Sequence, residues 1–87
     1  MPCRYGATPD HRIQVELVEA DIEIGFRLVD SVQSRPADVV RLLSDAEGVY
    51  RDALTRIERL EPPERASFQP LIAELRRAID LAAGPAG

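Results

Sequence analysis

The side chains that could perform chemistry are few in this sequence of 87 residues. His11 is the only histidine and Cys3 the only cysteine, whereas a zinc site draws several ligands from such residues. One cysteine also excludes a disulfide within the chain. The serines have no histidine and carboxylate around them in the arrangement of a nucleophilic triad. We therefore interpret His11 as a surface residue, and we predict no catalytic residue.

Three carboxylates come closest to a functional pattern. Glu16, Glu19 and Glu23 are spaced by three and four residues, which places them on one side of a helix. Carboxylate metal sites in helical bundles use such spacing, but they pair glutamates with histidines that point into a core. These three lie on a polar arc, so we interpret them as a solvated face. A carboxylate metal enzyme is the least favoured function, and we expect no metal and no cofactor.

Phosphate and nucleic-acid chemistry are also disfavoured. The five glycines are isolated from one another, so no glycine-rich loop surrounds a phosphate. The 15 acidic residues outnumber the 11 basic ones. The resulting net charge of −4 opposes the phosphate neutralisation that dominates nucleic-acid affinity. We expect the partner of this chain to be a protein and not a nucleic acid.

The sequence shows neither a membrane anchor nor a secretory signal. No apolar run approaches the roughly 20 residues that a membrane span needs. The first residues lack the apolar stretch of a signal peptide. We therefore expect a cytoplasmic protein without membrane contact. All 11 basic residues are arginine, which we interpret as the codon bias of a GC-rich bacterial genome.

Three amphipathic segments supply the scaffold. They predict an all-α fold, an antiparallel up-down-up three-helix bundle with long first and second helices and a shorter third helix. The single domain is expected at residues 10–83, between a flexible N-terminal arm at 1–9 and a flexible C-terminal tail at 84–87. Asp10 is the expected N-cap of the first helix, and Pro36 ends that helix because proline disfavours the helical conformation of Arg35.

The first helix carries two apolar stripes. We name them the Ile13 stripe and the Val18 stripe, and together they cover more than half of the helix circumference. The Ile13 stripe contains Ile13, Leu17, Ala20, Ile24 and Leu28. The Val18 stripe contains Val15, Val18, Ile22, Phe26, Val29 and Val32.

A strand is the alternative for part of this segment. Residues 20–26 alternate between apolar and polar types and include β-branched side chains. A single strand in so short a chain would have no partner unless two copies paired through it. The helix is therefore the favoured interpretation.

The second and third helices differ in how clearly they begin. The second, from residue 37 or 38 to Leu60, has one continuous stripe, and Gly48 lies on its solvent face. The third ends before Gly84, and its start depends on Pro70. A start at Ser67 puts Pro70 in the first turn, where proline is tolerated. A start near Pro63 would enclose Pro70, and this alternative stays open.

One segment resembles a known repeat. Residues 48–60, with Ala53 as a small residue between apolar positions, are similar to the second helix of a tetratricopeptide repeat. The same stretch looks like the second helix of microtubule-interacting and transport domains. Arg41 occupies the position where the repeat's first helix has glycine. Any amphipathic helix with a small residue in its contact stripe has the same pattern, and we favour the interpretation that residues 48–60 are such a helix.

The two stripes of the first helix lead to the functional hypothesis. A third helix of about 16 residues could not cover the whole of a first helix of about 25, so part of the Val18 stripe should stay exposed for a partner. We predict a protein–protein interaction or assembly module, self-associating as a homodimer through the first helix. The alternative is an accessory or regulatory, chaperone-like partner of another protein. The candidate interface residues are Val15, Val18, Ile22, Phe26 and Val29.

Overall fold

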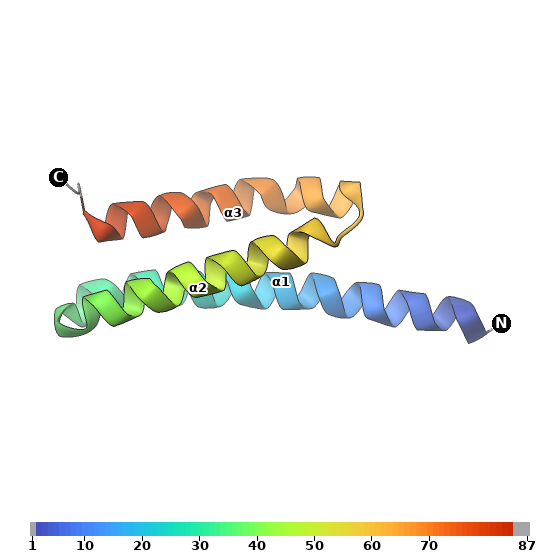
Figure 1. The fold of residues 1–87 in the computed structure, drawn as a ribbon, viewed down its shortest axis with the longest axis horizontal. Coiled ribbons are helices and arrows are strands. Elements are labelled where there is room, and N and C mark those ends of the chain that lie inside the picture. Colours follow the sequence, from blue (N-terminus) through green and yellow to red (C-terminus); the bar gives the residue numbers. More distant parts are fainter. Residues whose placement is uncertain (1, 85–87) are drawn as a thin grey trace.

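Three helices form the molecule in the computed structural model (Figure 1). The structure describes residues 2–84, with side chains from residue 12 onward. Helix α1 spans Pro2–Ser34, the short 3-10 turn η1 spans Pro36–Asp38, α2 spans Val39–Glu58 and α3 spans Pro62–Ala83. The helices run up, down and up, as predicted, and each contacts the other two. No strand occurs within residues 2–84, so the strand alternative for residues 20–26 is wrong.

Helix α1 begins earlier than the sequence predicted. It starts at Pro2 rather than at Asp10 and continues through Pro9. Proline at an interior position removes one backbone hydrogen bond, so the helix is weakest there. The flexibility of the arm at residues 1–9 stays a prediction. Of the predicted tail at 84–87, only Gly84 belongs to the described residues.

Helix α2 has the predicted phase with slightly different ends. Its first residue is Val39, because Pro36, Ala37 and Asp38 form the separate turn η1. Gly48 has no neighbouring atom within 4 Å of the place a β-carbon would take, which agrees with a solvent-facing position. The buried residues of the predicted stripe are Leu42, Ala46, Ala53, Ile57 and Leu60.

Helix α3 is longer than predicted. It begins at Pro62 and has 22 residues against 20 in α2, so it is not the shorter helix and Ser67 does not cap it. Glu61 is extended, and the two following prolines occupy the first helical positions, where a missing amide hydrogen costs nothing. Pro70 lies inside the helix but is exposed, so the carbonyl it leaves unpaired can bond to water.

The core is a single apolar cluster to which every helix contributes. Helix α1 supplies Val18 and Ile22, and α2 together with the following turn supplies Ala46, Ala53, Ile57 and Leu60. Leu42 is also buried but lies outside this cluster. The residues from α3 are Phe68, Ile72, Leu75 and Ile79. The molecule around this core is elongated, with extents of 56 × 20 × 15 Å.

Candidate interaction surface

The Val18 stripe faces inward. Val18 is fully buried and Ile22 is 5% exposed, while Val15, Phe26 and Val29 pack partly buried against the same cluster. All five residues of the predicted interface therefore belong to the core of one copy or to its edge. Val18 and Ile22 are covered by neighbouring helices within one copy, whereas an interface through the partly buried Val15, Phe26 and Val29 stays a prediction.

A glycine allows this close packing of α1 and α3. Gly25 is buried on the inner face of α1, and a β-carbon placed on it would lie 2.8 Å from Leu75 Cδ2. Non-bonded carbon atoms normally lie about 3.5–4.0 Å apart, so a β-carbon at this position would overlap the Leu75 side chain. Leu75 is itself fully buried. Gly25 therefore marks a close approach of α3 to α1, which was not predicted from the sequence.

The Ile13 stripe is the apolar face that stays outside. Ile13 is 50% exposed and Ile24 is 46% exposed, and Ala20 between them is exposed as well. Leu17 is half-buried, and Leu28 at the end of the stripe packs against the core. The apolar face of α1 that stays partly exposed is therefore the Ile13 stripe and not the Val18 stripe.

Charged residues border the exposed stripe on both sides. Glu16 and Glu23 lie along one edge and are exposed. Arg27 contacts Glu23 at 3.4 Å across one helical turn. At the other edge, Asp21 of α1 accepts a 2.9 Å hydrogen bond from Arg56 of α2, and both side chains are partly buried. This ion pair fixes how α2 lies beside the stripe.

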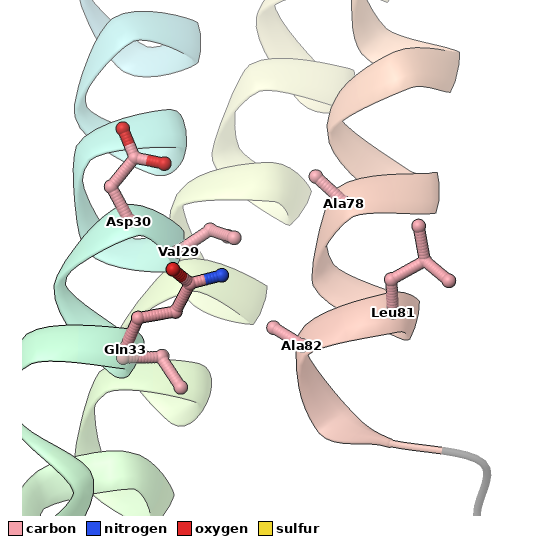
Figure 2. A pocket seen from close by; sticks show the side chains of 7 residues that line it. Val29, Asp30, Gln33, Ala78, Leu81 and Ala82 are labelled. Carbon is pink, nitrogen blue, oxygen red and sulfur yellow. The ribbon is translucent and has the colours of Figure 1, made fainter.

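A shallow groove lies between α1 and α3 near the end of α3 (Figure 2). Its volume is about 390 Å³, and in Figure 2 Val29 and Gln33 point toward Ala78 and Ala82 across it. Leu81 beside it is 74% exposed. The groove is small and half open, and its lining mixes apolar with polar side chains. The lining residues are Val29, Asp30, Val32, Gln33, Ala78, Leu81 and Ala82.

Arg76 forms the densest polar contact, between α3 and α2. Its guanidinium donates hydrogen bonds of 2.9 and 2.7 Å to the Glu47 carboxylate and of 3.1 and 2.7 Å to Oδ1 of Asp80. It also lies 4.9 Å from the centre of the Tyr50 ring. The hydrogen bond from Arg76 lowers the pKa of Glu47, and the bonds to Glu47 and Asp80 raise the pKa of Arg76. Because Arg76 is paired with both Glu47 and Asp80, the cluster links α3 to α2, and the Arg76 guanidinium is not available to a ligand.

The described side chains form no metal-binding group. Among the described side chains, no three histidine, cysteine or carboxylate residues lie in reach of a common ion. Glu16, Glu19 and Glu23 are exposed on α1, where the sequence analysis placed them. The side chains of Cys3 and His11 lie outside the described ones. In the part of the chain from residue 2 to 84, no helix is long and apolar enough to cross a membrane.

Comparisons of the chain with protein-family models, with curated proteins and with solved structures give no match. The resemblance of residues 48–60 to two helical families therefore gains no support from the family models. Its physical basis holds, because Ala53 is fully buried in the contact stripe of α2. The observations that bear on function therefore come from the surface of this chain.

That surface is larger than the mass of the chain predicts. The molecule exposes 5977 Å², whereas a folded monomer of 9.6 kDa exposes about 5,100 Å². Its radius of gyration is 15.3 Å, against about 12 Å for a compact chain of this length. This excess follows from the elongated shape of the molecule, whose extents are 56 × 20 × 15 Å.

Proposed function

We propose that this chain is a protein–protein interaction module that assembles through the exposed Ile13 stripe of α1. The observation that carries the proposal is the exposure of Ile13, Ala20 and Ile24 along one face of a helix whose opposite face is buried in the core. Apolar side chains at alternating three- and four-residue spacing form the contact face of paired helices.

The experiment measures the mass of the protein in solution by sedimentation equilibrium, at concentrations from about 10 μM to 1 mM, the range of modest protein affinities. We expect a reversible dimer. Ile24→Asp should give a monomer, because the new charge would have to be buried in the contact. Val40→Asp is the matched control, since Val40 is 80% exposed on α2 and does not belong to the stripe. A wild-type monomer at 1 mM would contradict self-assembly.

The acidic edge favours a second candidate function. Glu16 and Glu23 lie beside the stripe, so a separate protein that presents an apolar helix with basic flanks would be attracted to it. In that case the wild-type chain stays a monomer. A synthetic amphipathic peptide with an apolar stripe and arginine flanks is the appropriate ligand. It should bind the wild type and the Val40→Asp variant and fail to bind Ile24→Asp.

A further inference from the structure

We infer that the groove between the last turns of α1 and α3 is a separate binding site, which takes a short segment of another protein with an apolar side chain flanked by basic residues. No residue of the Ile13 stripe lines this groove. The inference therefore does not rest on the assembly proposed above.

The apolar part of the groove comes from both helices. Each helix contributes two partly buried residues, which are Val29 and Val32 from α1 and Ala78 and Ala82 from α3. The two alanines leave open the space that a longer side chain on α3 would fill, and Leu81 beside them is 74% exposed. The volume of about 390 Å³ lies near the lower limit of ligand pockets, roughly 300 Å³. The groove therefore suits an anchoring side chain rather than a whole helix.

Two helix C-termini make the surroundings of the groove negative. Helices α1 and α3 end at the same end of the molecule (Figure 1), and the terminal carbonyl groups of a helix are equivalent to about half a negative charge. A basic side chain in the last turn commonly compensates this charge, but neither helix has one there. Arg35, which follows α1, is paired with Asp38 at 3.3 Å. A cation supplied by a partner would therefore be attracted to both helix ends.

The side chains along the groove add further negative charge. Asp30 is exposed at the α1 edge (Figure 2), and Glu74 is exposed one turn before Ala78 on α3. Within the described residues, neither carboxylate has an ion-pair partner. The opposing charge is Arg77, which is exposed one turn before Leu81. Two carboxylates and two helix ends outweigh this one arginine, so the groove is complementary to a basic segment.

The probe is a synthetic peptide of about six residues, with one leucine flanked by arginines, which is too short to form a stable helix. Heteronuclear NMR of the protein should show chemical-shift changes at Val29, Gln33 and Ala78 when the peptide is added. Ile13 and Ile24, in the stripe, should not respond. The Ile24→Asp variant should show the same changes at the groove, because its substitution lies outside the lining.

Charge variants test why the peptide binds. The double variant Asp30→Asn with Glu74→Gln should raise the dissociation constant of the arginine peptide about fivefold, since each exposed pair contributes a small factor. Asp45→Asn with Glu58→Gln is the matched control, because it makes the same chemical change at exposed positions of α2, which does not line the groove. This control should stay within about twofold of the wild type.

A variant of opposite sign and a second peptide complete the test. Arg77→Glu should lower the dissociation constant, because it replaces the repelling charge with an attractive one. A peptide with glutamates in place of the arginines should bind at least about tenfold more weakly. Circular dichroism checks that each variant keeps its helices.

Four outcomes would overturn the inference and leave the proposed function intact. They are equal affinity for the two peptides, equal losses in the groove variant and its control, shift changes at the stripe instead of the groove, and no change with about 10 mM arginine peptide, a concentration that detects even weak binding. A shift of the groove signals when the chain alone is concentrated would also overturn it, because a second copy would then occupy the groove.

Discussion

The two faces of α1 are built from the same residue types and have opposite environments. The inner face carries Val18 and Ile22 in the core, and the outer face carries Ile13 and Ile24, each about half exposed. Hydrophobicity therefore does not determine which face a bundle covers. The difference lies at Gly25, whose missing side chain lets Leu75 approach the inner face. A glycine beside one of two similar stripes is the local sign that another helix packs closely on that side.

The largest expected effect separates the two faces directly. Ile22→Ala should lower the free energy of unfolding by about 2–5 kcal/mol, because it leaves a cavity in the core. Ile24→Ala should stay within about 1 kcal/mol of the wild type when measured at concentrations where the chain is monomeric. Urea denaturation gives both values. Comparable losses for the two variants would show that the outer face is covered within one copy.

A second variant tests the role of the close approach. Gly25→Ala should lower the free energy of unfolding by about 1–3 kcal/mol, because the new β-carbon would overlap Leu75, which is buried and cannot move freely. Gly48→Ala is the control, since its β-carbon would meet no atom within 4 Å. It should stabilise the helix by about 0.5–1 kcal/mol. If both substitutions stabilise the protein, α3 does not lie as close to α1 as described.

A smaller effect is expected at the border between the faces. The pair formed by Asp21 and Arg56 is partly buried, so its strength should lie between those of exposed and buried pairs. A double-mutant cycle with Asp21→Ala and Arg56→Ala should give a coupling energy of about 1 kcal/mol. A coupling near zero would mean that this pair does not fix α2 beside the stripe.

The smallest expected effect lies away from α1 and is a pH dependence. The hydrogen bond from Arg76 lowers the pKa of Glu47 in the folded state, so folding is favoured when this carboxylate is charged. The contribution is complete above the pKa of the unfolded chain, near 4.5, and it is lost as the pH falls through the lower folded pKa. Acid titration should show that the free energy of unfolding falls less in the Glu47→Gln variant than in the wild type over that pH range.

Much of the fold follows from the apolar pattern of the sequence. The phase of α2 is correct because a single stripe continues past Gly48 without interruption. The start of α3 near Pro63, which the sequence left open, agrees with the observed start at Pro62, whereas the start at Ser67, which puts Pro70 in the first turn, is wrong. A proline inside a helix is tolerated when its neighbouring carbonyl reaches water, and exposure is a property of the packed structure that the sequence pattern does not contain.

The candidate surface was only half predictable. The pattern alone shows that α1 has two apolar stripes, which is more than its neighbouring helices would cover. An exposed apolar face could therefore be expected. Choosing between the stripes requires the path of α3, which depends on where that helix begins and on contacts between residues far apart in sequence. Gly25 was the local signal, since a buried glycine within a helix indicates close packing of another element.

The odd number of helices also determines how the protein resists force. Because the chain runs up, down and up, the start of α1 and the end of α3 lie at opposite ends of the long axis (Figure 1). Tension between these two points acts along the helices, so α1, α2 and α3 must slide past one another and their contacts are loaded together. Tension between the end of α1 and the end of α3, which lie at the same end of the molecule (Figure 1), would instead peel α3 away one turn at a time. The same core should therefore withstand a larger pulling force in the first direction than in the second.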